Sequence, residues 1–150
     1  MFPHSRIDLR LTLLVALVAL ASAPAVAQEQ PLAYAHDDAS VEWGPCPEFM
    51  PKGCSIAVLH GNPAEANADI LFRVPGGSHI ASHWHTSAER MILLSGKMKV
   101  TYAGKEPVTL KKGMYAYGPP KAPHSAHCAE GDPCVLFIAF EEAVDAVATE

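Results

Sequence analysis

The sequence predicts an all-β domain, built as a sandwich or a barrel. About nine or ten short segments alternate apolar and polar side chains, and turn residues separate them. Only sixteen residues separate Gly96 from Gly113, which leaves room for two short strands and for no helix between them. Without its first 27 residues the chain has about 123 residues, a length that suits one domain with one core.

Residues 1–27 have the pattern of a cleavable secretory signal. Two arginines come before an apolar run at residues 11–21, and Ala25-Val26-Ala27 offers small side chains for cleavage. A membrane anchor is the alternative, but the apolar run is shorter than the ~20 residues of a span. We therefore predict cleavage after Ala27 and a periplasmic or secreted protein with no membrane attachment.

Residues 28–40 are polar and rich in alanine, so we predict a flexible arm ahead of one domain at residues 41–150. In the first half of this domain, prolines and glycines end the apolar segments. These segments predict strands over residues 41–46, 55–60, 68–74, 78–85 and 88–94.

The second half of the domain follows the same pattern. Turns such as Ala103-Gly104-Lys105 and Glu130-Gly131-Asp132 separate alternating segments. The segment at residues 133–140 is the most apolar, so we expect it to be a central strand, and the acidic, alanine-rich end at residues 141–150 predicts a short helix or a frayed tail. The predicted strands cover residues 98–102, 108–110, 114–118, 123–128 and 133–140.

The charge of the chain disfavours some partners. The net charge is −5 with histidine neutral, and removing the predicted signal takes away two arginines and one aspartate. Lys111-Lys112 is only a pair, and no basic cluster remains. Binding to nucleic acid or to an anionic membrane surface is therefore not expected.

Four cysteines follow the predicted signal, and an even number in an exported chain is typical of disulfides. Three pairings of Cys46, Cys54, Cys128 and Cys134 are possible. We favour the two local pairs, Cys46 with Cys54 and Cys128 with Cys134, because each closes a short loop that contains proline or glycine. A cysteine zinc site is the alternative, but gaps of seven and five residues do not fit its usual spacing.

The stretch from His83 to Glu89 carries candidate metal ligands. His83 and His85 project from the same face of a strand, because successive strand side chains alternate. Gly76-Gly77 comes before the pair and a β-rich segment follows it, so we interpret the stretch as strand, turn and strand. This geometry folds Glu89 back beside the imidazoles. Such ligands suit one divalent transition metal ion, such as Fe, Mn, Ni, Zn or Cu.

With its flanking glycines the stretch reads Gly77-x5-His83-x-His85-x3-Glu89-x6-Gly96, and a second segment reads Gly113-x5-Pro119-x4-His124. This spacing resembles the two motifs of the cupin superfamily. The resemblance implies a jelly-roll barrel (a double-stranded β-helix) that holds the metal inside, with His124 as a further ligand. The second motif departs from the family at Lys121, where glycine is usual, and at Cys128, where asparagine is frequent.

His79 is a candidate residue beside the metal. If the alternation over residues 78–85 is unbroken, His79 and Ala81 share the face of His83 and His85. His79 would then lie beside the ligands. The alternative is a histidine that faces solvent near the barrel mouth.

Tyrosines supply the other candidates for a catalytic role. Tyr115 and Tyr117 share a face of one predicted strand, where they form either barrel wall or phenols that point at a bound ligand. Tyr102 is a further candidate. No residue besides the four ligands identifies a catalytic base.

The resemblance gives a class of protein but no substrate. A metal ion with open coordination positions can activate a carbonyl, an enolate or O₂. We therefore expect a dioxygenase-, isomerase- or lyase-type enzyme for a small organic ligand. The alternatives are a non-catalytic module that binds a metal or a small ligand, and a structural barrel with an unused site. Cupin barrels often dimerise, and an edge strand near residues 41–59 could pair with a second copy.

Overall fold

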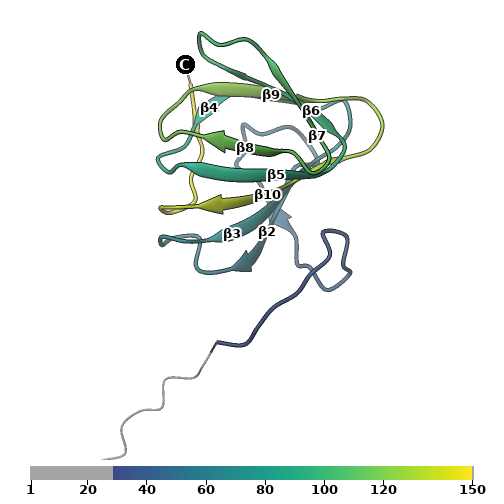
Figure 1. Ribbon diagram of the computed structural model, residues 1–150, viewed down its shortest axis with the longest axis vertical. Helices are drawn as coiled ribbons and strands as arrows, with labels where there is room; N and C mark the ends of the chain where they lie inside the picture. Colours follow the sequence, from purple (N-terminus) through teal and green to yellow (C-terminus); the bar gives the residue numbers. More distant parts are fainter. Residues whose placement is uncertain (1–28, 150) are drawn as a thin grey trace, which may run out of the picture. The chain divides into compact units, whose positions relative to one another are not determined.

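Eleven strands form two sheets in the described part of the chain, residues 29–149 of a computed structural model (Figure 1). The predicted signal at residues 1–27 lies outside the described residues. Ala33–Glu150 clusters as one unit, which carries every strand, and residues 29–32 belong to a second unit and have no regular structure. The strands are β1 (Gly44–Pro45), β2 (Ser55–His60), β3 (Asp69–Val74), β4 (His79–Trp84), β5 (Glu89–Ser95), β6 (Lys97–Tyr102), β7 (Val108–Lys111), β8 (Tyr115–Gly118), β9 (His124–Cys128), β10 (Cys134–Phe140) and β11 (Val147–Ala148).

The two sheets lie face to face as two layers (Figure 1). One has the strand order β1-β2-β3-β10-β5-β8, and the other has the order β11-β4-β9-β6-β7. All the pairings described are antiparallel. This arrangement confirms the predicted all-β jelly roll. Within residues 29–149, no helix has the length and hydropathy that a membrane span requires.

Strand β10 lies in the middle of its sheet, as its apolar sequence predicts. It pairs with β3 along one edge and with β5 along the other. Five of its seven side chains are buried. A strand that is covered on its faces and paired on both edges has little polar surface to offer, which is why its sequence is nearly all apolar.

The prediction of a helix or a frayed tail after residue 140 is wrong. Strand β11 pairs with the edge of β4, with Val147 opposite Trp84 and Ala148 opposite His83. The backbone N–H of Thr149 also donates to the carbonyl of Ser82 at 3.0 Å. The pairing partner is more than sixty residues away in the sequence, so local propensity carries no signal for it.

The two sheets enclose an apolar core. Its members come from both layers, and they surround the cavity that is described below. The buried core residues are Ile70, Phe72, Val74, Ile80, Met91, Leu93, Met98, Leu110, Cys128, Cys134, Leu136, Ile138 and Phe140.

The cysteines form two disulfides, Cys46–Cys54 and Cys128–Cys134. The first closes the loop that leads from β1 to β2. The second joins the end of β9 in one sheet to the start of β10 in the other. No free cysteine occurs in the described part of the chain. Disulfides of this kind are typical of an oxidising compartment.

Candidate metal centre

A β-bulge in β4 sets the direction of His83. The register between β4 and β9 shifts between Ile80 and His83. Both of these side chains are buried, and Ala81 and Ser82 between them are exposed. The alternation along this strand is therefore broken, and His79 does not share the face of His83, because one extra residue re-aims the side chains that follow it.

Backbone carbonyls fix the imidazoles of His83 and His124. Each ring donates from Nδ1 to the carbonyl two residues earlier in the chain, at 2.8 Å for His83 and 3.0 Å for His124. A carbonyl oxygen can only accept, so the proton of each neutral ring lies on Nδ1. Nε2 keeps its lone pair, which is the form in which a histidine binds a metal ion.

His85 is held in the same way from a distant part of the chain. It follows the last residue of β4, and its Nδ1 donates to the backbone carbonyl of Asp145. The Asp145 carboxylate accepts from the backbone N–H of Thr86 at 2.8 Å and from the Thr86 hydroxyl at 2.5 Å. The segment before β11 therefore fixes the ring of His85.

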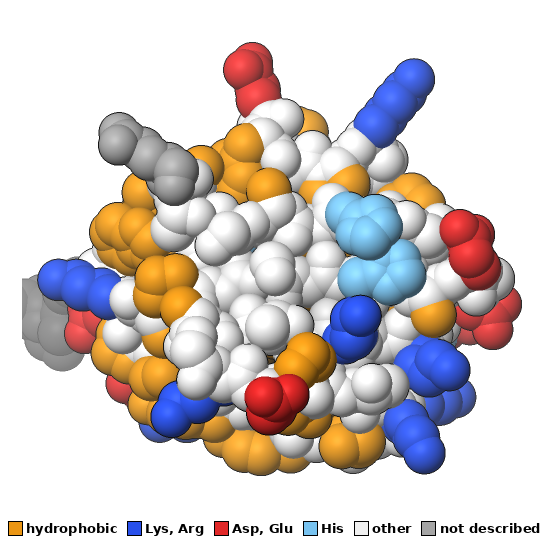
Figure 2. Space-filling view, turned by 90° about the horizontal axis from the view of Figure 1, so that it is seen from above, with side chains coloured by type: hydrophobic (Ala, Val, Ile, Leu, Met, Phe, Trp, Pro, Cys, Tyr) orange, Lys and Arg blue, Asp and Glu red, His pale blue; other side chains and the backbone are white. Residues whose placement is uncertain are grey.

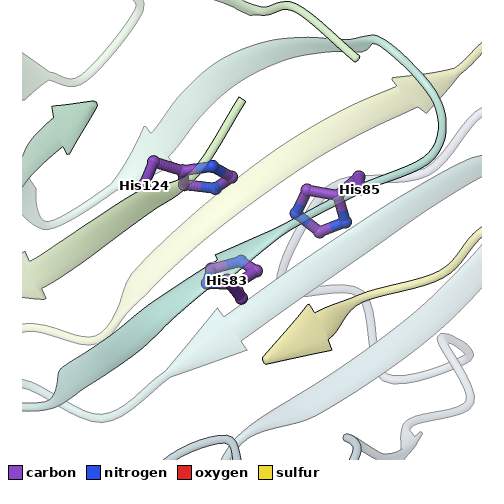
Figure 3. A group of neighbouring side chains, drawn as sticks. All are labelled: His83, His85 and His124. Atoms are coloured by element: carbon purple, nitrogen blue, oxygen red, sulfur yellow. The ribbon is translucent and has the colours of Figure 1, made fainter. Parts of the chain in front are cut away.

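The three imidazoles form one cluster inside the barrel (Figure 3). One ligand atom from each of His83, His85 and His124 lies within 4.8 Å of the others, and all three residues are buried. His83 and His124 sit opposite each other on β4 and β9, with ring centroids 4.3 Å apart. These three histidines are positioned so that they could hold one metal ion.

Glu89 faces this cluster from the opposite sheet. It is the first residue of β5 and is buried. Its Oε1 lies 3.3 Å from Nε2 of His85, and its Oε2 lies 3.8 Å from Nε2 of His124. The carboxylate therefore lies on the side of the rings where their lone pairs point.

Burial shifts the pKa of each group in the cluster toward its neutral form. It raises the pKa of Glu89 to about 8, and the nearby Asp145 carboxylate adds to that shift. Burial lowers the pKa of His124 to about 4, with a smaller lowering from His83. The pKa values of His83 and His85 are also lowered, chiefly by burial.

The residues present fit a divalent transition metal ion. The imidazoles stay neutral at neutral pH, as metal ligands must. A buried carboxylate without a cation is costly, and it is drawn toward its protonated form here. A divalent cation among these donors would stabilise the carboxylate in its charged form.

The cluster opens into an apolar cavity of about 210 Å³ between the sheets. Among the described residues that line it, the polar side chains are the three histidines with Glu89, Tyr102 and Asp145. The other lining residues are Pro47, Met50, Ile56, Ile70, Phe72, Ile80, Met91, Met98, Val100, Ala126, Leu136, Ile138, Phe140, Val144 and Ala146. A cavity of this kind suits a small organic molecule.

Three predicted candidates lie outside this cavity. His79 is exposed and contacts His127, with ring centroids 4.2 Å apart. Figure 2 shows histidine side chains lying side by side at the surface. Tyr115 and Tyr117 are 59% and 49% exposed on β8, on the outer side of their sheet. The exposed position of His79 agrees with the alternative of a solvent-facing histidine, and Tyr115 and Tyr117 do not point into the cavity.

Two residues in the centre had no signal in the sequence. Asp145 lies in the acidic, alanine-rich end of the chain, where nothing in the sequence indicates that its carbonyl and carboxylate fix His85 and Thr86. Ser87 is buried, and its hydroxyl accepts from the backbone N–H groups of Glu141 and Glu142 at 2.8 Å and 3.0 Å. Both contacts join the turn between His85 and Glu89 to the C-terminal segment.

Solved structures with a similar fold include proteins of several activities. The polyketide cyclase RemF from Streptomyces resistomycificus gives a TM-score of 0.65 at 18% identity, over 81% of this chain and 87% of that chain. The DMSP lyase DddQ from Ruegeria pomeroyi DSS-3 gives a TM-score of 0.63 at 18% identity, over 73% of this chain and 61% of that chain. A cupin 2 conserved barrel domain protein from Rhodopseudomonas palustris gives a TM-score of 0.60 at 18% identity, over 74% of this chain and 77% of that chain.

At this identity the similarity shows the fold alone, and the chain spans about three fifths of the length of the lyase. A search of curated proteins found no sequence relative. The jelly roll and its central group of three histidines define a cupin. More narrowly, residues 33–144 match the model of the ChrR cupin-like domain, and the chain belongs to that family.

Proposed function

We propose that this protein is an exported cupin that binds one divalent transition metal ion and a small organic molecule beside it. In this proposal His83, His85 and His124 bind the ion through Nε2, and Glu89 binds it through its carboxylate. The cluster of three histidine ligand atoms, with the buried carboxylate of Glu89 against Nε2 of His85 and His124, carries the proposal. When bound, the ion would act as a Lewis acid on an oxygen of the small molecule.

The residues of the cavity suit a metal-dependent enzyme. Its apolar wall suits the carbon body of a small ligand. Similar folds include a lyase and a cyclase. We propose reactions of the lyase or isomerase type, with dioxygenase-like chemistry as the version that requires a redox-active ion.

A non-catalytic binding module is the second candidate. The described cavity contains no lysine, serine or cysteine that could act as a nucleophile, and its only hydroxyl belongs to Tyr102. This composition is compatible with tight binding without turnover. The two candidates differ in whether the bound small molecule is chemically converted. A binding module releases its ligand unchanged, and an enzyme releases a product.

The proposed location is the periplasm or the exterior. The two disulfides support an oxidising compartment, and the sequence of residues 1–27 supports export. The mature chain then starts at Gln28, with an arm over residues 28–40 before the domain at residues 41–150. Fractionation and N-terminal sequencing of the natively expressed protein test this directly, and a cytoplasmic, uncleaved chain would contradict it.

Thermal unfolding tests the metal site. An ion that binds only the folded state raises Tm, by mass action. The mature protein is expected to lose several degrees of Tm in chelator and to regain them with Zn²⁺, Mn²⁺ or Ni²⁺. His85→Ala should show neither change. His79→Ala is the matched control, because His79 lies outside the cavity, and it should behave as the wild type. A wild-type Tm that does not respond to chelator or metal would overturn the proposal.

A further inference from the structure

Tyr102 brings a hydroxyl group into the metal centre from β6. It is the last residue of that strand and lies opposite His124 on β9. The centroids of the two rings are 4.9 Å apart, and Tyr102 lines the cavity. The phenol therefore packs against one of the histidines of the cluster.

The hydroxyl of Tyr102 is buried and has no hydrogen-bond partner among the described residues. An unsatisfied hydroxyl in a protein interior destabilises the fold, because its hydrogen bond to water is lost and not replaced. Native proteins pair the great majority of such groups, and an exception calls for an explanation. One explanation is a partner that arrives with a bound molecule.

Gly118 shows where the hydroxyl points. A Cβ atom built on Gly118 would lie 2.6 Å from the Tyr102 oxygen and 2.9 Å from Oε2 of Glu89. The phenol and the carboxylate thus approach the same point on β8, which stays open only because residue 118 is glycine. The hydroxyl lies next to the carboxylate that faces the histidines, without being bonded to it.

When Glu89 is ionised beside a bound ion, the hydroxyl of Tyr102 is the one side-chain donor that the described cavity wall leaves free. The three imidazoles donate from Nδ1 to backbone carbonyls. The remaining lining side chains are apolar or are carboxylates. A ligand with an oxygen atom near the ion would therefore have Tyr102 as its hydrogen-bond donor.

We propose that Tyr102 donates a hydrogen bond to an oxygen atom of the molecule that binds at the metal centre. This inference rests on the proposed function above and narrows it. The ligand class is a small molecule with an apolar body that presents a carboxylate, enolate or carbonyl oxygen to the ion. The apolar wall accepts the body, and the ion and Tyr102 together fix the oxygen.

The test uses the mature protein loaded with Co²⁺, whose visible spectrum reports ligand exchange. Acetate is the oxygen probe, and imidazole is the comparison probe, because imidazole bound through one nitrogen has no acceptor left to receive a hydrogen bond. Tyr102→Phe is expected to weaken acetate binding about tenfold and to leave imidazole binding within about twofold, which corresponds to the loss of one hydrogen bond. Tyr117→Phe is the control, since Tyr117 lies on the outer side of the sheet, and it should change neither.

The possible failures are distinguishable. If the wild type does not take up one equivalent of Co²⁺, the proposed function fails and this inference fails with it. If Co²⁺ binds but Tyr102→Phe leaves acetate affinity unchanged, only the inference about Tyr102 is overturned. Equal weakening of acetate and imidazole would also overturn it, since that result indicates a change in packing. The metal-free Tyr102→Phe protein should have a Tm no lower than the wild type, because the hydroxyl has no protein partner to lose.

Discussion

Nδ1 of His85 donates a hydrogen bond to the backbone carbonyl of Asp145, sixty residues later in the chain. The same aspartate holds Thr86 through both carboxylate oxygens. The C-terminal segment therefore helps to hold the histidine cluster in place, although no side chain of this segment belongs to the cluster. Groups that orient metal ligands typically contribute 10–100-fold to metal affinity.

Weakening this support should weaken metal binding. Thr86→Val removes the hydroxyl donor but keeps the shape of the side chain and the charge of Asp145. We expect the metal dissociation constant to rise about tenfold, measured by competition with a chelator of known affinity. Thr149→Val is the matched control, because it removes only the bond from the Thr149 hydroxyl to the carbonyl of Ser82 in the same segment. Equal affinities of the Thr86 and Thr149 variants would show that the Asp145 contact does not position His85.

Replacing Lys121 with glycine should stabilise the folded protein. Its φ is 58°, in the left-handed region, where a side chain costs about 1–2 kcal/mol. Glycine removes this strain but loses about 0.5–1 kcal/mol to the greater freedom of the unfolded chain. Lys121→Gly is expected to raise the free energy of unfolding by up to about 1 kcal/mol in urea titrations. Lys112→Gly, at an exposed turn without a positive φ, should give no rise. A clear loss of stability in Lys121→Gly would contradict the strain argument.

The metal-free protein should become less stable as pH rises through neutrality. The folded pKa of Glu89 is raised from 4.5 to about 8, so the folded state holds a proton that the unfolded state has lost. The three histidines, with lowered pKa values, act in the opposite sense below pH 6.5. The free energy of unfolding should therefore fall between about pH 6.5 and 8. Glutamine cannot ionise, so in Glu89→Gln the free energy of unfolding, measured by urea titration, should no longer fall across this pH range. If the fall persists in the variant, a group other than Glu89 causes it.

The Cys128–Cys134 disulfide should stabilise the fold. It links the strand that carries His124 to the central strand of the opposite sheet. For a loop this short, the loss of unfolded-chain entropy is on the order of 2 kcal/mol. We expect the double variant Cys128→Ala, Cys134→Ala to lower the free energy of unfolding by about that amount, measured without reductant. A midpoint equal to that of the wild type would show that this bond contributes nothing to stability.

Most of the strands, and the meeting of the histidines, could be predicted from the sequence. Turn residues separate short alternating segments, and that pattern depends on local chemistry alone. The gaps between His83, His85 and Glu89 also carry information, because a strand, a short turn and a strand of fixed length leave few places for their side chains. The motif spacing then gave His124 its position.

The support of the site could not be predicted. The bulge between Ile80 and His83 has no distinctive residue, so the sequence does not decide whether His79 lies beside His83 or faces solvent. Asp145 and β11 depend on pairing between segments far apart in the chain. Local sequence patterns do not predict such contacts, because they form only when distant segments come together in the folded protein.

The metal content of the mature protein, exported natively and purified without chelator or an affinity metal, tests the central claim most directly. Elemental analysis should find about one equivalent of a divalent transition metal in the wild type and in His127→Ala, whose side chain contacts His79 outside the cavity. It should find almost none in His83→Ala. Metal below stoichiometry that is the same in all three proteins would contradict the account and leave a disulfide-linked barrel without a metal centre.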